Sequence, residues 1–431
     1  MSTVRTRMVP VIESGQALRL FFELEREVVR TLSAFVPRVG DLELKYKLAE
    51  HVWEAAQHAR FLRERGRELS GFGSDERVRD DVRRIFEESL HEEDELAGLA
   101  AYVRVLSTGL RRAYTAYLEA AQPLADWPTR NLVREFVDDL DRHELELESW
   151  LDRERPAWTA HLDAAYRARG GWYGEVAAEP LPAGFAWRQD ERDYAHPALP
   201  NRGAHPICAT AFGEDPDEFP IVRSWLSDPA TDARVVRAMV YVWLLGEADA
   251  VDYLATIFYD TPSAPFDYHF DLARHTWDES RHSNFGYRQL PRLGFDLMEV
   301  EQQVVLYDVL VRMQPHERYV MVTAVFEAGS FDIKAEVMNR VGELGDFEAD
   351  TLLAFDRSDE QNHVRYGHRW LPTLLELHGD DRDPKTFAAE TEARFWELNA
   401  AARDRIGHGL PQERRLTARR IRERVAAENG S

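Results

Sequence analysis

Apolar side chains recur along most of the chain at the spacing of one face of an α-helix. Alternation of apolar and polar residues, which would indicate strands, is scarce. In a first block the pattern predicts helices over residues 15–36, 42–69, 76–122 (with a break) and 128–155. In a second block it predicts helices over residues 231–260, 266–290, 296–313, 316–343 and 346–377, followed by 386–404 and 411–427. We therefore expect an all-α protein.

The stretch between the two blocks interrupts the pattern with glycines and prolines, as in GGWYGEVAAEPLPAGF. It is long and rich in Trp, Tyr and Phe, which favours an ordered segment over a flexible linker. At 431 residues the chain also exceeds the size at which one core keeps growing. We therefore expect a helical domain over residues 1–170, an ordered connection over 171–228 and a second helical domain over 229–431.

A repeat runs through the second block. DESRHSNFGYRQLP (278–291) matches DEQNHVRYGHRWLP (359–372) in Asp-Glu-x-x-His and in a downstream aromatic, Gly, Arg, Leu and Pro. A glutamate precedes each copy at nearly the same distance: Glu247 before the first and Glu327 before the second. The block therefore contains two copies of a helix pair, each carrying Glu and then Asp-Glu-x-x-His.

The spacing within each Glu-x-x-His is typical of metal ligands on a helix. Residues i and i+3 lie on one helix face, so the glutamate and histidine of each Glu-x-x-His can point into a helical bundle together. The six candidate metal-ligating and catalytic residues are Glu247, Glu279, His282, Glu327, Glu360 and His363. Four unpaired glutamates in a helical core would cost several kcal/mol per ion, whereas two divalent cations would neutralise all four. Oxygen and imidazole donors without thiolate suit iron or manganese. The sequence thus predicts a two-metal carboxylate site in a four-helix bundle.

An aspartate precedes the ligand glutamate in both copies. Asp278 and Asp359 can each accept the second imidazole N–H of a ligand histidine, which fixes the tautomer and raises the basicity of that ring. Because the pair is symmetric, we expect this role rather than that of solvated helix charges.

These residues resemble the ferritin-like di-iron carboxylate superfamily. A glutamate, about thirty residues and then Asp-Glu-x-Arg-His is the pattern of di-iron monooxygenases, acyl-carrier-protein desaturases and the ribonucleotide reductase radical subunit. In this chain it reads Glu247, followed by Asp278, Glu279, Ser280, Arg281 and His282. The second copy departs at Asn362, where arginine is common. The resemblance covers about 150 residues and concerns the metal site rather than the substrate.

The resemblance implies two iron ions, with manganese or a mixed iron–manganese pair as the alternative. It further implies a non-heme oxidase or monooxygenase that activates O2 to hydroxylate, desaturate or N-oxygenate a small organic substrate. A ferroxidase or a rubrerythrin-like peroxide-reducing protein is the alternative. The chain has no flavin or iron–sulfur motif, so electrons would come from a separate ferredoxin or reductase.

Two further residues stand one turn before the ligand glutamates. His275 and Asp356 are candidate extra ligands, because arylamine N-oxygenases of the same superfamily carry a ligand histidine in His-x-x-x-Glu-x-x-His. Those enzymes have it on the second motif helix, whereas His275 lies on the first, so packing or hydrogen bonding is the alternative. Phe326 and Phe331, which flank Glu327, are candidates for lining a substrate cavity.

A weaker repeat relates the two blocks. YKLAEHVWEAAQHARF (46–61) aligns with FDLARHTWDESRHSNF (270–285), and Glu23 then aligns with Glu247. Ala55 stands at the position of Glu279, and Leu140 at that of Glu360. We therefore expect the first domain to be a degenerate copy of the bundle without a metal site.

The composition of the chain limits the kinds of molecule that it is expected to bind. A net charge of −23 disfavours nucleic acid, because binding a polyphosphate depends on Lys and Arg. No apolar run is long enough for a membrane span, and the first residues lack the apolar segment of a signal peptide. Cys208 is the single cysteine, so a disulfide framework is excluded. These features predict a cytoplasmic protein that acts on a small molecule, with the oligomeric state open.

Overall fold

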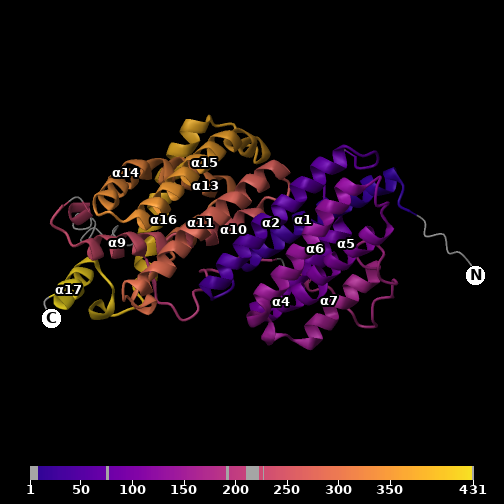
Figure 1. The fold of residues 1–431 in the computed structure, drawn as a ribbon, viewed down its shortest axis with the longest axis horizontal. Coiled ribbons are helices and arrows are strands. Elements are labelled where there is room, and N and C mark those ends of the chain that lie inside the picture. The colour runs from indigo at the N-terminus through magenta and orange to yellow at the C-terminus, as the bar shows by residue number, and fades with distance from the viewer. Residues whose placement is uncertain (1–7, 74–76, 191–193, 210–222, 227, 430–431) are drawn as a thin grey trace, which may run out of the picture. The chain divides into compact units, whose positions relative to one another are not determined.

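The computed structural model describes residues 8–73, 77–190, 194–209, 223–226 and 228–429. Helices form almost all of the regular structure in these residues, so the fold is all-α, as predicted (Figure 1). The chain forms two compact units. Unit 1 comprises Met1–Phe35 and Glu50–Ala195, and unit 2 comprises Val36–Ala49 and His196–Ser431. No described helix is both long and apolar enough to cross a membrane.

These units differ from the expected division in two places. Residues 36–49, which include the start of α2 (Leu42–Arg67), belong to unit 2. The expected connection is divided between the units after Ala195. Its residues 191–193, 210–222 and 227 lie outside the described residues.

A buried charge cluster explains why residues 36–49 belong to unit 2. The Lys45 Nζ donates to Asp252 Oδ1 at 2.8 Å and to the Val36 carbonyl at 2.6 Å. Arg202 donates to the same Asp252 and lies 3.8 Å from Asp249 Oδ1. All four charged side chains are buried, so each depends on its partners to offset the loss of hydration.

Unit 1 contains a succession of helices that continues beyond the predicted set. Its elements are α1 (Val11–Phe35), most of α2, α3 (Asp80–Glu88), η1 (Ser89–His91), α4 (Glu95–Ala101), the π-helical η2 (Tyr102–Ser107), α5 (Thr108–Ala120), α6 (Trp127–Leu147), η3 (Glu148–Arg153), α7 (Pro156–Arg169) and η4 (Arg188–Asp190). The helix predicted over 76–122 is broken, as expected. The predicted helices of this block ended at residue 155, but the structure has a further helix, α7, that begins at Pro156. Proline is well tolerated in the first turn of a helix, so it begins this one rather than interrupting it.

Unit 2 contains the longest helices. Its elements are β1 (Ile207–Cys208), α9 (Ala233–Leu245), α10 (Ala248–Asp260), α11 (Phe266–Arg292), η5 (Leu297–Glu299), β2 (Gln302–Gln303), α12 (Val305–Leu310), α13 (Pro315–Val320), the π-helical η6 (Met321–Phe326), α14 (Glu327–Glu343), α15 (Phe347–Leu377), α16 (Pro384–Ile406), η7 (Gln412–Arg414) and α17 (Ala418–Asn429). The strands β1 and β2 pair in parallel over two residues each. Neighbouring helices in this unit include α10 and α11, α11 and α15, and α14 and α15 (Figure 1).

Three predicted helices of the second block are interrupted. The helix expected over 231–260 breaks at Gly246, and Glu247 caps the start of α10. The helix expected over 296–313 is reduced to η5, β2 and α12. The helix expected over 316–343 contains the π-helical η6 immediately before Glu327. A π-helical turn shifts the following side chains around the axis, so it changes where Glu327 points.

The glycine shared by both copies of the repeat permits close helix packing. A Cβ at Gly286 on α11 would overlap the Tyr241 carbonyl on α9, and one at Gly367 on α15 would overlap Thr323 in η6. The conserved spacing from histidine to glycine within the repeat therefore has a packing function.

Candidate metal centre

The structure brings all six predicted ligands together within unit 2. Glu247 caps α10, Glu327 begins α14, and the two Glu-x-x-His pairs lie on α11 and α15. Five of the six are buried, and Glu247 is partly buried. Together with His275 and Asp356 they form three overlapping groups, in each of which the donor atoms lie within 4.8 Å of one another.

The first group, called cluster A, joins His275, Glu279, Glu327 and His363. His275 Nε2 lies 2.7 Å from Glu327 Oε1, and His363 Nδ1 lies 3.2 Å from the same oxygen. His363 Nδ1 is also 3.5 Å from Glu279 Oε1. The rings of His275 and His363 stack with centroids 3.7 Å apart. His275 therefore stands among the donors of the candidate centre, on the helix where its spacing predicted it.

The second group, called cluster B, joins Glu247, Glu279 and His282. His282 Nδ1 lies 3.4 Å from Glu247 Oε2 and 3.7 Å from Glu279 Oε1. Glu279 belongs to clusters A and B, so it would be a ligand common to both sites.

The third group, called cluster C, joins Glu247, Asp356 and Glu360. The amine of Lys334 lies among them: its Nζ is 2.7 Å from Asp356 Oδ2, 2.8 Å from Asp356 Oδ1 and 3.7 Å from Glu247 Oε1. It also donates to Glu360 Oε1. The candidate ligand Asp356 is thus paired with a lysine.

Sequence reasoning missed Lys334, although two signals were available. It is one of only four lysines among 54 basic residues. It also lies seven residues after Glu327 on α14, a spacing that returns to the same helix face.

Unpartnered polar atoms support a fit to cations. Glu247 Oε2, Glu279 Oε1, His282 Nδ1 and Glu327 Oε2 are buried without a hydrogen-bond partner among the described residues. Buried polar groups are almost always hydrogen-bonded, so such a concentration requires an explanation. Each atom belongs to a residue of cluster A or B and is a donor type that iron and manganese accept. The residues therefore fit two divalent ions.

The pKa values of the glutamates also fit a site that binds cations. Burial raises the pKa of Glu279 well above its ordinary value, and Glu247 and Glu327 add to the rise against the opposing His282. Burial raises the pKa of Glu360 to about 8 against the opposing charge of Lys334. Burial also opposes ionisation of Glu327, but His275 and His363 lower its pKa to about 2. Glu279 and Glu360 therefore bind a proton more tightly than a free glutamate does, so a cation that binds them would displace protons.

The two aspartates pair with histidines across the repeat. Asp278 Oδ2 lies 3.2 Å from His363 Nε2, and Asp359 Oδ2 lies 3.4 Å from His282 Nε2. Each ring can thus donate Nε2–H to an aspartate and turn Nδ1 toward the clusters. The aspartate that precedes one ligand glutamate therefore serves the histidine of the other helix.

Two arginines hold these aspartates in position. Arg281 Nη2 donates to Asp359 Oδ2 at 2.6 Å and also to Asp278. Arg274 Nε donates to Asp278 Oδ2 at 2.8 Å. Both guanidinium groups lie over the ring of Trp277: that of Arg274 is 4.9 Å from the ring centroid, and that of Arg281 is 4.6 Å from it.

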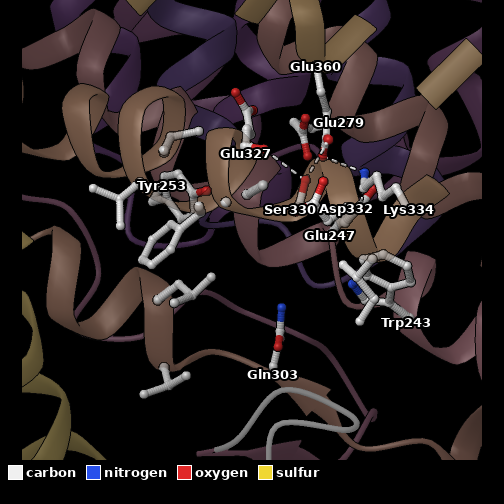
Figure 2. A pocket seen from close by; sticks show the side chains of 18 of the residues that line it. Trp243, Glu247, Tyr253, Glu279, Gln303, Glu327, Ser330, Asp332, Lys334 and Glu360 are labelled. Carbon is white, nitrogen blue, oxygen red and sulfur yellow. Dashed lines mark hydrogen bonds and ion pairs between the residues drawn. The ribbon is translucent and has the colours of Figure 1, made fainter. Parts of the chain in front are cut away.

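A cavity of about 630 Å³ adjoins the carboxylates. Figure 2 shows Glu247, Glu279, Glu327 and Glu360 gathered on one side of it, with Lys334 beside them. The rest of the wall is mainly apolar or aromatic and includes Leu226, Met239, Val240, Trp243, Tyr253, Val322, Val325, Phe326, Ile333 and Trp396. Of the two predicted cavity residues, Phe326 lines it, whereas Phe331 is partly buried and is not among the lining residues.

Unit 1 contains histidine contacts similar to those around the clusters of unit 2. The rings of His51 and His143 stack with centroids 3.7 Å apart, like those of His275 and His363. His58 Nε2 lies 3.1 Å from Asp139 Oδ2, which matches the contact between His282 and Asp359.

The residues between these histidines in unit 1 differ from those in unit 2. Ala55, Ser107 and Leu140 line a cavity of about 20 Å³ together with the histidines. Ala55 and Leu140 are the residues that align with Glu279 and Glu360 in the sequence. Unit 1 also contains a π-helical segment, η2, as unit 2 contains η6.

Residues 226–418 match a family model described as "Protein of unknown function (DUF455)". The match contains all six candidate ligands as well as Lys334. No curated protein and no solved structure matches the chain.

Proposed function

We propose that unit 2 is a non-heme di-iron oxidoreductase that uses O2 to oxidise a small organic substrate by hydroxylation, desaturation or N-oxygenation. The observation that carries the proposal is the pair of donor clusters that share Glu279 and adjoin a largely apolar cavity. A pocket of this size accommodates a drug-sized molecule.

In this proposal cluster A holds one ion and cluster B the other, with Glu279 common to both. When bound, iron supplies the redox chemistry that reduces dioxygen; manganese or a mixed pair is the alternative. Electrons come from a separate ferredoxin or reductase.

The protein's own residues prepare the site. Asp278 and Asp359 hold the ring protons of His363 and His282 on Nε2, so that both Nδ1 atoms would be free to bind the ions. The apolar wall near Trp243, Tyr253 and Phe326 excludes water and orients a substrate beside the carboxylates. This cavity favours an enzyme acting on an organic molecule over a ferroxidase or a peroxide-reducing protein.

We further propose that the chain contains two ferritin-like bundles in tandem, the first of which is degenerate. Support comes from the stacked histidines, the matching histidine–aspartate contacts and the π-helical segment found in each unit. Ala55 and Leu140, which stand in the sequence where Glu279 and Glu360 do in unit 2, account for the difference in cavity chemistry.

Metal analysis of the purified full chain tests the proposal. Wild type loaded anaerobically with ferrous iron and desalted should retain two ions per chain, whereas Glu279→Ala should lose at least one. Glu376→Ala, which removes an exposed glutamate from α15, is the matched control and should retain both. Equal iron content in Glu279→Ala and wild type would contradict the site assignment.

Oxygen consumption separates the candidate functions. The proposed enzyme should take up O2 in proportion to its two bound ions and stop when no reductant is supplied. A ferroxidase would continue to oxidise many added ferrous ions per chain, and that result would exclude the organic oxidase.

A further inference from the structure

Cluster C differs from clusters A and B because a side chain of the protein supplies its cation. Lys334 is only 1% exposed, and its Nζ contacts Asp356, Glu360 and Glu247. It also lies 5.4 Å from the centroid of the Trp243 ring, which adds a favourable cation–π contact.

Hydrogen bonding separates Glu360 from the other candidate ligand glutamates. Glu360 Oε1 accepts from Lys334, and its Oε2 accepts from Ser330 Oγ at 2.9 Å. In contrast, Glu247, Glu279 and Glu327 each have a buried oxygen without a hydrogen-bond partner among the described residues. The partners of Glu360 thus lie within the protein, while those of the other three glutamates are incomplete.

The charges of the centre balance only when Lys334 is included. The three clusters contain five carboxylates: Glu247, Glu279, Glu327, Asp356 and Glu360. Two divalent ions neutralise four of them, and one ammonium group neutralises the fifth. Because the centre is buried, a remaining net charge would be costly.

We propose that Lys334 occupies cluster C in place of a third metal ion and, with Ser330, holds Glu360 away from the two ions of clusters A and B. Lys334 is then a positioning residue that makes the centre asymmetric, with His275 rather than Glu360 completing cluster A. The inference rests on the proposed function, which sets the number of metal ions at two. Its test can nevertheless fail while the proposed function stands, and the reverse.

Removal of the ammonium group should create a vacant cation site. Lys334→Met keeps most of the side-chain volume but leaves three carboxylates, two buried and one partly buried, whose oxygens hard divalent cations accept. Manganese(II) added anaerobically to the full chain is the probe, and the electron paramagnetic resonance signal of free manganese measures binding. We expect wild type to bind two ions per chain and Lys334→Met to bind three.

Three further variants test whether an extra ion in Lys334→Met binds at cluster C. Lys385→Met removes an exposed lysine and should still bind two ions. Lys334→Met combined with Asp356→Asn removes a ligand of cluster C and should return the count to two. Lys334→Gln gives the same neutral test if Lys334→Met does not fold, as judged by circular dichroism.

The outcomes distinguish this inference from the proposed function. Two ions in both wild type and Lys334→Met, with unchanged affinities, would overturn the role of Lys334 and leave the di-metal centre standing. No ion in wild type but one in Lys334→Met would overturn the di-metal function and support the occupation of cluster C by Lys334. No ion in either protein would overturn both.

Discussion

At the residue scale, a few side chains decide which donors face the candidate ions. The histidines of the Glu-x-x-His pairs have one nitrogen toward the carboxylates and the other toward an aspartate. His275 lacks such an aspartate contact: its Nδ1 is buried without a hydrogen-bond partner among the described residues. Burial and the nearby His363 lower the pKa of His275 to about 4, so its ring is neutral near pH 7 and able to donate a lone pair.

The crossed aspartates predict which ion each one supports. Asp359→Asn should weaken the ion of cluster B about 10–100-fold, because Asp359 orients His282 rather than His363. Asp278→Asn should weaken the ion of cluster A through His363 by the same reasoning. Mössbauer spectra of iron-loaded variants distinguish the two positions. If each substitution affects the ion held by the histidine of its own helix, the crossed pairing is wrong.

His58 in unit 1 predicts a pH-dependent stability. Burial lowers its pKa, but Glu25 and Asp139 more than compensate and raise it from 6.5 to about 9. A raised pKa means that protonation of His58 stabilises the folded state fully below about pH 6.5, and that this stabilisation is lost as pH rises through 9. His58→Gln should therefore lower the free energy of unfolding most at pH 6 and least above pH 9.

Urea unfolding of the full chain at several pH values measures this effect. His368→Gln, which replaces an exposed histidine, is the control and should not reproduce the trend. A stability difference for His58→Gln that is constant from pH 6 to pH 10 would contradict the prediction.

At the element scale, helix interruptions and close packing set the positions of the ligands. Glu247 is located where α9 ends and α10 begins, and Glu327 follows a π-helical segment. A regular helix through either position would rotate the carboxylate around the axis. Close contacts at Gly286 and Gly367 then fix the long helices α11 and α15 against their neighbours.

Gly286 predicts a large effect for the smallest substitution. Gly286→Ala should destabilise unit 2 by about 1–3 kcal/mol, because its Cβ would overlap the backbone of α9. Gly342→Ala on α14 is the matched control, because a Cβ there meets no atom within 4 Å. It should stabilise the helix by up to about 1 kcal/mol. Thermal unfolding followed by circular dichroism compares the two, and equal stabilities would contradict the packing argument.

At the scale of the whole molecule, the chain divides its charges between two kinds of buried cluster. In one, protein cations satisfy the carboxylates, as Lys45 and Arg202 do for Asp252. In the other, clusters A and B, the protein leaves donor atoms without partners. All three candidate donor groups found among the described residues lie in unit 2. The stability of unit 2 should therefore depend on metal, whereas that of unit 1 should not.

Metal removal tests this difference between the units. Saturating ferrous or manganous ion at 100 times its dissociation constant should stabilise unit 2 by about 2.7 kcal/mol per ion site, because the ions bind the folded state. Scanning calorimetry with and without a chelator should show only one of the unfolding transitions shifting. Hydrogen exchange of α11 and α15, compared with α5 and α6, assigns that transition to its unit. A uniform shift of both units would contradict the prediction.

The sequence by itself determined the helical class and the repeat, and it selected six candidate ligands that the structure brings together, because each depends on spacing within one helix. Residues i and i+3 share a face whatever the helix packs against. The crossed pairing of Asp278 and Asp359, the association of His275 with Glu327 and the insertion of Lys334 were decided only by the tertiary structure. These contacts join different helices, so they depend on how each helix is rotated, interrupted and packed, which a periodic pattern does not specify.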